Sequence, residues 1–160
     1  MHFGLMTFLA REQVPFELLT HREAYTAQAR AAAAHVPGRL VAKAVVVRDP
    51  VDDWCALAVI PAHRHVDLTR MRALTGRPRL RLADEAWFSP LFADCEVGAI
   101  PPFGRMFGGL AVYLDEALAA QDCLVASAGT HHEELRVPMS DYLRIARPEI
   151  ARLSTERRAA

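Results

Sequence analysis

Lys43 is the only lysine of this 160-residue chain, whose other basic residues, of 19 in all, are arginine. It stands in an apolar run, residues 40–48, whose β-branched side chains predict a β-strand. Because side chains alternate along a strand, Lys43 shares its face with Val41, Val45 and Val47. An unpaired ammonium is costly to remove from water, so it needs an anionic partner, a water-filled pocket or a lowered pKa. The pattern indicates a functional pocket, and the alternative is an edge strand whose lysine reaches solvent.

A second feature is the segment G-A-I-P-P-F-G, which begins at Gly98 and ends at Gly104. Its two adjacent prolines fix the backbone φ angle and donate no hydrogen bond, while the glycines permit turns that other residues avoid. The segment therefore predicts a rigid loop that presents a few backbone N–H groups. Such groups could hold a carbonyl oxygen or a small carboxylate-like group, although a purely structural Pro-Pro turn is the alternative.

The third feature is the segment S-A-G-T-H-H-E-E, which begins at Ser127. His131 and His132 suggest a metal at first, but adjacent side chains point apart and no H-x-x-x-H helix brings two imidazoles together. We therefore predict polar turn residues at the rim of the same pocket and no metal. A catalytic triad is also not indicated, since no serine or cysteine lies in a G-x-S-x-G sequence.

The elements that must position these residues follow from periodicity and from turn signals. Helices are predicted at residues 3–13, 26–35, 67–74, 83–88 and 115–118, and from 138 or 140 to 150. Strands are predicted at residues 16–19, 40–48, 54–60, 79–82, 110–114, 123–127 and 135–137. Hairpins mixed with crossovers predict an α+β (mixed α/β) fold, with helices packed around a sheet. We expect a single domain over residues 1–153 and a polar tail over residues 154–160.

Composition and charge give the chain no global signature of a nucleic-acid binder. The formal net charge is zero, so any RNA contact has to come from a local patch. A solvated protein surface explains the best candidate for such a patch equally well. This candidate is a cluster of arginines: Arg64, Arg70, Arg72, Arg77, Arg79 and Arg81. The three isolated cysteines and the lack of a signal segment or a long apolar span predict a cytoplasmic protein with no membrane or DNA partner.

Taken together, the three segments resemble the YbaK/ProX family of trans-editing aminoacyl-tRNA deacylases, which is related to the insertion domain of bacterial prolyl-tRNA synthetase. The resemblance rests on Lys43 within A-K-A-V-V-V, the G-A-I-P-P-F-G loop and S-A-G-T-H-H, in this order and at this spacing. It covers nearly the whole chain. It implies a largely antiparallel mixed sheet wrapped by helices, and hydrolysis of the ester between a wrongly attached amino acid and the 3′ end of a tRNA.

The resemblance also implies roles for individual residues. Lys43 would contact the terminal adenosine region, while the loop of Gly98, Ala99, Ile100, Pro101 and Pro102 would hold the aminoacyl group through its backbone and limit its size. Gly98 and Lys43 are the expected catalytic residues. Further residues expected beside the substrate are Gly129, His131, His132 and Glu134. No cofactor is implied, and the partners implied are the acceptor end of an aminoacyl-tRNA and, as a further candidate, a synthetase.

The chemistry of an aminoacyl ester agrees with this implication. The ester is already activated, so an enzyme needs to position water or the ribose hydroxyl and to stabilise an oxyanion, without a strong protein base. Family members specific for alanine usually carry asparagine after the lysine, whereas this chain has Ala44. This difference counts against specificity for alanine. The candidates for the misattached amino acid are cysteine, serine, alanine and threonine. Two alternatives remain: a non-catalytic module that binds aminoacyl-tRNA or a synthetase, and an unrelated small-molecule pocket.

Overall fold

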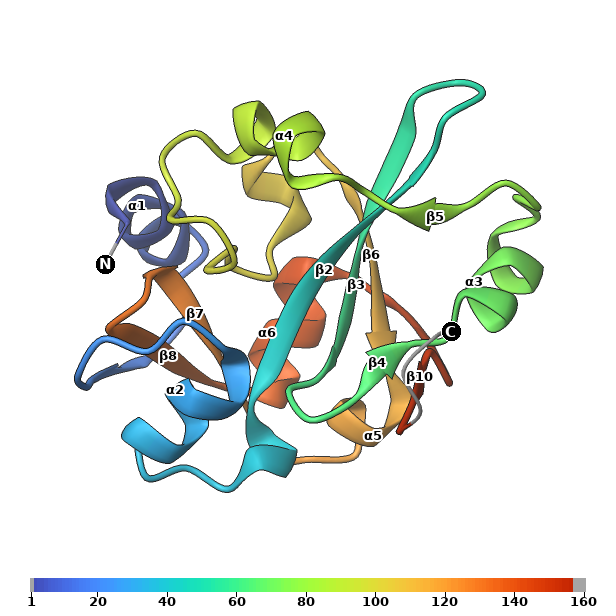
Figure 1. The fold of residues 1–160 in the computed structure, drawn as a ribbon. Coiled ribbons are helices and arrows are strands. Elements are labelled where there is room, and N and C mark those ends of the chain that lie inside the picture. The colour runs from blue at the N-terminus through green and yellow to red at the C-terminus, as the bar shows by residue number, and fades with distance from the viewer. Residues whose placement is uncertain (1, 157–160) are drawn as a thin grey trace.

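A mixed sheet of five strands forms the centre of the protein, in the order β5-β2-β3-β6-β9 (Figure 1). The structure is a computed structural model that describes residues 2–156. The strands are β2 (Ala42–Asp49), β3 (Trp54–Pro61), β5 (Arg81–Leu82), β6 (Ala111–Asp115) and β9 (Glu149–Ala151). β2 and β3 form the expected antiparallel hairpin, while β6 pairs parallel with β3 and β9 pairs parallel with β6.

A second sheet of three antiparallel strands has the order β1-β8-β7. Its strands are β1 (Glu17–Thr20), β7 (Cys123–Thr130) and β8 (Glu133–Pro138). The register of β7 against β8 shifts between Ser127 and Thr130, which marks a bulge at the end of β7. The chain between Gly129 and Glu134 was expected to be one turn, but the strands continue to a tight turn at His131 and His132.

The two sheets approach each other where β2 begins. Val41 and Val125 form a parallel bridge between them, and a large apolar core fills the space behind. That core contains Leu57, Val59 and other residues of the central sheet, together with Leu135 and others of the second sheet. The expectation of an α+β fold with a largely antiparallel mixed sheet is confirmed.

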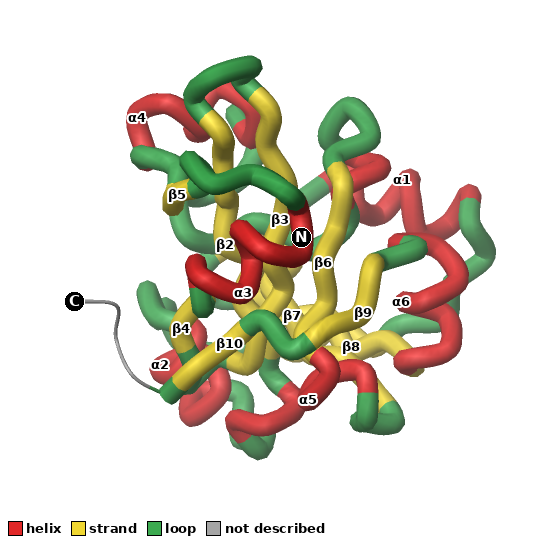
Figure 2. The backbone as a smooth tube through the Cα atoms, turned by 90° about the vertical axis from the view of Figure 1, so that its right-hand side faces the viewer, coloured by secondary structure: helices red, strands yellow, loops and turns green. Residues whose placement is uncertain are grey.

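Helices surround both sheets, as Figure 2 shows from a second direction. They are α1 (Phe3–Arg11), α2 (Ala27–Ala33), α3 (Leu68–Thr75), α4 (Glu85–Phe88), α5 (Glu116–Ala119) and α6 (Met139–Ala146). Short 3-10 turns lie at η1 (Gly38–Leu40), η2 (Ser89–Phe92) and η3 (Gly104–Met106). The sequence signals for caps are realised: the side chain of Thr26 accepts a hydrogen bond at the start of α2, and that of Asp67 does so at the start of α3.

One prediction for the C-terminal part was wrong. The last helix was expected to reach residue 150, but α6 ends at Ala146, because Arg147 takes a left-handed conformation (φ 47°) and Pro148 cannot continue a helix. Ile150 then lies in β9 instead of on a helix.

The segment from Ser154, which was expected to be a polar tail, begins with a short strand. Ser154 and Thr155 form β10 (Ser154–Thr155), which pairs with β4 (His65–Val66). The buried carboxylate of Asp115 accepts hydrogen bonds from the Ser154 hydroxyl (2.7 Å) and the Leu153 N–H (2.9 Å), which fixes this end of the chain. The remainder of the expected tail, residues 157–160, lies outside the described residues.

Candidate active site

Lys43 lies in β2 at a point where the strand has a neighbour on one side only. It is opposite Ile60 of β3, while β5 pairs with β2 only at Val47 and Arg48. Among the described residues, no strand lies along the outer edge of β2 between the Val41 bridge and these pairs. The local environment is thus closer to the edge-strand alternative than to a fully central strand. The Lys43 side chain is half-buried, so part of it remains accessible to solvent.

The face of β2 that carries Lys43 is interrupted between two small apolar clusters. Val41 packs with Val125 and residues of α2, whereas Val45 and Val47 pack with a separate cluster beneath α3. The opposite face of β2, with Ala42 and its neighbours, contributes to the large core. Lys43 therefore occupies a polar interval on a face that is otherwise apolar.

Ser127 of β7 contacts the glycine-proline loop. Val41, directly before β2, forms a parallel bridge with Val125 of β7, and Lys43 and Ser127 each follow two residues later in their own strand. The Ser127 hydroxyl donates a hydrogen bond to the carbonyl oxygen of Ala99 (2.9 Å). The predicted loop and the predicted rim segment are therefore in direct contact.

The loop itself is rigid, as its prolines predicted. Residues 99–104 are buried, and the Tyr142 hydroxyl donates to the carbonyl oxygen of Pro102 (3.0 Å). Gly104 must be glycine, because a Cβ there would lie 2.0 Å from the carbonyl oxygen of Leu110. Gly98 is different: it is exposed with φ +79°, so its conformation rather than the space around it favours glycine.

In the first part of the loop, residues 98–102, two backbone N–H groups have no acceptor within the described part of the protein. The Ala99 N–H donates to the carbonyl oxygen of Glu96 (2.9 Å), and the prolines have no N–H. Within residues 2–156, the N–H groups of Gly98 and Ile100 donate to no acceptor of the protein. Backbone donors of this kind can stabilise negative charge on a carbonyl oxygen where they point to the same position.

Gly129 and His131 lie against the start of the loop. The Glu96 N–H donates to the carbonyl oxygen of Gly129 (3.0 Å), and the His131 N–H donates to the carboxylate of Glu96. A Cβ placed on Gly98 would lie 4.0 Å from Cε1 of the His131 ring. The His131 side chain is largely buried beneath the ring of Tyr25, with 4.9 Å between the ring centroids. Sequence reasoning missed both Glu96 and Tyr25.

Glu134 lies deeper than expected. It is fully buried and forms an ion pair with Arg30 of α2 at 2.6 Å, and the His21 ring lies 3.8 Å from the same oxygen. Burial raises the pKa of Glu134 to about 7, and the Arg30 guanidinium opposes part of that rise. Glu134 thus holds α2 against β8 behind the rim and does not line an exposed site. The one signal for Arg30 was a lone charge among the alanines of α2.

The remaining predicted residues divide into two groups. His132 is exposed, and its carbonyl oxygen accepts the N–H of His21 (2.9 Å), so it closes the turn. The arginine cluster is partly used within the protein: Arg77 pairs with Asp52 (2.9 Å), and Arg70 with Asp67 (3.0 Å). These contacts favour the solvated-surface interpretation of that cluster over an RNA patch.

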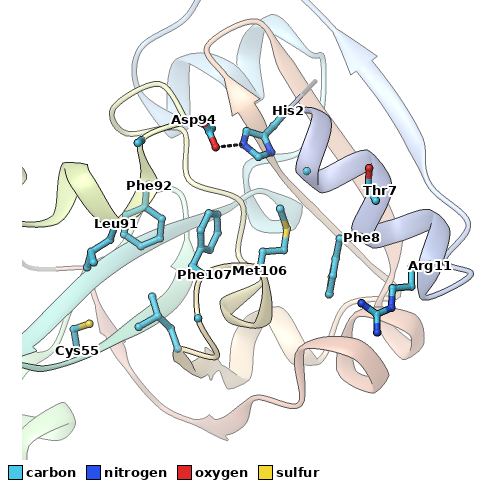
Figure 3. Close-up of a pocket in the computed structure, with 14 residues that line it drawn as sticks. His2, Thr7, Phe8, Arg11, Cys55, Leu91, Phe92, Asp94, Met106 and Phe107 are labelled. Carbon is cyan, nitrogen blue, oxygen red and sulfur yellow. Dashed lines mark ion pairs between the residues drawn. The ribbon is translucent and has the colours of Figure 1, made fainter.

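A separate cavity of about 710 Å³ lies between α1 and the chain around η2 and η3 (Figure 3). Phe8, Phe92, Met106 and Phe107 give it an apolar lining. None of the predicted site residues lines it. It nevertheless adjoins the site, because the N–H of His2, at its rim, donates to the carbonyl oxygen of Ala128 (3.0 Å).

The chemistry of the candidate site is therefore that of a cation and backbone donors. In residues 2–156 no three histidine, cysteine or acidic side chains are grouped so as to hold a metal ion. None of the described helices has the length and apolar character needed to cross a membrane. The cysteines described are free thiols, and burial raises the pKa of Cys95 to about 11, which makes it a poor nucleophile.

Comparison with known proteins gives one family match and several relatives. Residues 21–145 match the sequence model of the aminoacyl-tRNA editing domain. The chain is 30% identical over 155 residues to the multifunctional Ser/Thr-tRNA deacylase ProXp-y of Escherichia coli K12, covering 93% of this chain and 90% of the relative. The same protein of Escherichia coli O157:H7 gives the same identity and coverage.

Solved structures show the same fold at lower identity. A candidate trans-editing enzyme for prolyl tRNA synthetase superposes with a TM-score of 0.78 at 22% identity, covering 95% of each chain. A crystal structure of a hypothetical protein reaches a TM-score of 0.85 at 19% identity, covering 95% of this chain and 99% of the other. At these identities the likeness establishes the architecture.

Proposed function

Because the chain belongs to the aminoacyl-tRNA editing domain family, we propose that it hydrolyses the ester that joins serine or threonine to the 3′ end of a tRNA. Editing of aminoacyl-tRNA and deacylase activity are properties of the family and of the curated relatives. The choice of serine and threonine follows the named activity of those relatives. It also agrees with Ala44, which stands where alanine-specific members carry asparagine.

The observation that carries the proposal is the pair of N–H groups without an acceptor among the described residues, in the loop that contacts Ser127, together with Lys43 at the open edge of β2. The N–H groups of Gly98 and Ile100 would bind the ester carbonyl oxygen and stabilise the negative charge that develops when the carbonyl is attacked. The loop that presents them is fixed by Ser127 and Tyr142, so the donors need little rearrangement. Mutagenesis of such donors in other hydrolases costs about 10²–10³ in rate, which is a large share of what an activated ester requires.

Lys43 would act on the substrate as a compact positive charge. Its place at the open edge of β2 suits contact with the ribose or phosphate of the terminal nucleotide. The nucleophile would be a water molecule, which the adjacent ribose hydroxyl activates. The proton passes from the water to the departing 3′ oxygen, and the products are the free amino acid and the uncharged tRNA. No protein side chain has to act as a strong base in this scheme.

His131, Gly129 and the loop residues Ala99, Pro101 and Pro102 would shape the pocket that admits a small amino acid. Their contacts with Glu96 and Ser127 keep the wall in place. One methylene changes binding by only about 1–3 kcal/mol, so exclusion of larger amino acids has to come from shape.

The proposal extends to the domain organisation of the chain, its cellular location and a second partner. The chain acts as a single domain over residues 1–153, in the cytoplasm where aminoacyl-tRNA is made. A synthetase is a further candidate partner, because the resemblance extends to the insertion domain of prolyl-tRNA synthetase.

A deacylation panel tests the proposal. Wild-type protein is incubated with tRNAs charged with serine, threonine, alanine, cysteine or proline, and the ester that remains is measured against a buffer control. We expect seryl- and threonyl-tRNA to be hydrolysed fastest. If no charged tRNA is hydrolysed faster than in buffer, the enzyme proposal fails. Binding of charged tRNA without hydrolysis would establish the non-catalytic binding module instead.

A further inference from the structure

Tyr25 is a large aromatic residue that remains 67% exposed at the rim of the candidate site. It lies in the connection between β1 and α2, and one face of its ring packs on His131. A tyrosine that served only to cover a neighbour would be expected to bury more of its own ring. Its position calls for a further occupant on the open face.

The segment that carries Tyr25 is held firmly. The His21 N–H donates to the carbonyl oxygen of His132 (2.9 Å), and the Ala24 N–H donates to that of His131 (2.9 Å). Behind it, the buried Arg30–Glu134 ion pair fixes the middle of α2 to β8. An exposed ring on a fixed backbone loses little conformational entropy when a ligand stacks on it.

The surroundings of the ring indicate which group would stack there. Both Glu23 and Glu96 raise the pKa of the Tyr25 hydroxyl, so the ring stays neutral and its neighbourhood is acidic. An acidic neighbourhood disfavours a phosphate but offers acceptors to an exocyclic amino group. A nucleobase has both a flat face for the ring and, in adenine, such an amino group.

The distances agree with one nucleotide. The His131 ring separates Tyr25 from Gly98, with 4.9 Å between the two aromatic centroids and 4.0 Å from Cε1 to a Cβ built on Gly98. In an aminoacyl-tRNA the ester and the base are carried by the same ribose. A base on Tyr25 would therefore leave the ester within reach of the loop.

From these observations we infer that Tyr25 is the stacking platform for the terminal adenine of the tRNA. The inference rests on the proposed function, which supplies the substrate, and it assigns a binding residue that acts on affinity rather than on the chemical step. Stacking of a base on an aromatic side chain contributes enough that its loss weakens binding by roughly tenfold.

The test compares two variants on two substrates. Tyr25→Leu keeps an apolar cover over His131 but cannot stack on a base, whereas Tyr25→Phe can. The matched control is Phe3→Leu, which removes another exposed ring, on α1. Each protein is assayed on a serylated minihelix that ends in adenosine and on one whose terminal nucleotide is abasic. We expect Tyr25→Leu to raise KM about tenfold on the first substrate with kcat within twofold, and to leave KM on the abasic substrate unchanged. Tyr25→Phe and Phe3→Leu should match wild type.

An equal effect of Tyr25→Leu on both substrates would overturn the inference, since the ring would then only support His131. A second readout does not depend on hydrolysis: an uncharged minihelix with 2-aminopurine as its terminal base is titrated with each protein. Quenching by wild type and Tyr25→Phe but not by Tyr25→Leu supports stacking, and equal quenching by all three contradicts it. If wild type quenches the base but hydrolyses no ester, the proposed enzyme function fails while the stacking platform stands.

Discussion

Two regions of the molecule meet at the same piece of backbone, Ala128 and Gly129, and they differ in which residues they contain. The one between α1 and η3 is a cavity of about 710 Å³ with an apolar, aromatic lining (Figure 3). The other, at the open edge of β2, holds Lys43, Ser127 and the loop that begins at Gly98. A search for a cavity would single out the first, but Lys43 and the loop whose Gly98 and Ile100 N–H groups have no acceptor among residues 2–156 belong to the second. A site for ester hydrolysis is recognised by its donors and its charge, not by its volume.

The largest expected effect on catalysis comes from removing the charge of Lys43 at the open edge of β2. We expect Lys43→Ala to lower kcat/KM for seryl-tRNA by at least about 100-fold, because the substrate loses a positioning charge. Its melting temperature should stay within about 2 °C of wild type, since the lysine is half-buried and contributes little packing. The exposed Arg79→Ala serves as the control and should leave both quantities unchanged. Normal activity in Lys43→Ala would remove the main reason for placing the reaction on this side.

Lys43→Arg separates charge from shape. A planar guanidinium presents its donors differently from a compact ammonium, so we expect a loss of about tenfold or more in kcat/KM. Near-normal turnover by this variant would mean that any cation suffices at position 43. The same single-turnover assay serves for both substitutions.

Gly129 contacts both regions, through His2 on one side and Glu96 on the other, and its substitution should cost stability. It has φ +97°, and a Cβ there would lie 2.7 Å from Cβ of His2, so Gly129→Ala must both strain the backbone and displace α1. We expect a loss of about 3 kcal/mol in the free energy of unfolding. Gly108→Ala is a matched control, because Gly108 also has a positive φ (+71°) but nothing lies within 4 Å of its Cβ position. Chemical denaturation should therefore show a smaller loss there, about 1 kcal/mol. Equal losses in the two variants would rule out the close contact with His2.

The buried Glu134 should make stability depend on pH. Its pKa is raised by burial to about 7, above the value of about 4.3 in an unfolded chain. Its contribution to stability is therefore fully present below about pH 4.3 and is lost as the pH rises through about 7. Between about pH 5 and pH 8, the free energy of unfolding of wild type should fall relative to that of Glu134→Gln. Glu17→Gln, which removes an exposed partner of Arg136, should show no such trend. A constant difference between wild type and Glu134→Gln across this range would contradict the raised pKa.

The smallest effect on catalysis is expected from the apolar cavity. Leu91 lies at its edge and is 46% exposed, so Leu91→Ser removes apolar lining with little loss of packing. Deacylation of seryl-tRNA should stay within about twofold of wild type. A loss comparable to that of Lys43→Ala would show that the substrate occupies the cavity and would reverse the assignment of the two regions.

Much of the scaffold was predictable because its signals are local. Asp67 before α3 and Gly76 after it are a cap and a left-handed stop, and the helix lies between them. The strand around Lys43 and its hairpin partner follow from β-branched residues and an Asp-Asp turn. The prolines after Ile100 predicted a rigid loop for the same reason, since they restrict the backbone without help from distant residues.

What could not be predicted depends on contacts between distant segments. Arg30 and Glu134 are more than a hundred positions apart, and nothing in either local sequence shows that both are buried as a pair. Ile150 was assigned to a helix because its apolar neighbours have helical spacing, yet a left-handed Arg147 and the parallel edge of β6 place it in a strand. The unused N–H groups of Gly98 and Ile100 are likewise a property of the folded loop, since only the fold determines which donors find acceptors.

The placement of the substrate can be observed with a stable analogue, an adenosine whose 3′ position carries serine through an amide in place of the ester. A crystal structure of the protein with this analogue should show its carbonyl oxygen within hydrogen-bond distance of the N–H of Gly98 or Ile100. Lys43 should lie beside its ribose and the Tyr25 ring against its adenine. Binding of the analogue in the apolar cavity between α1 and η3, with the edge of β2 empty, would contradict the assignment of the active site.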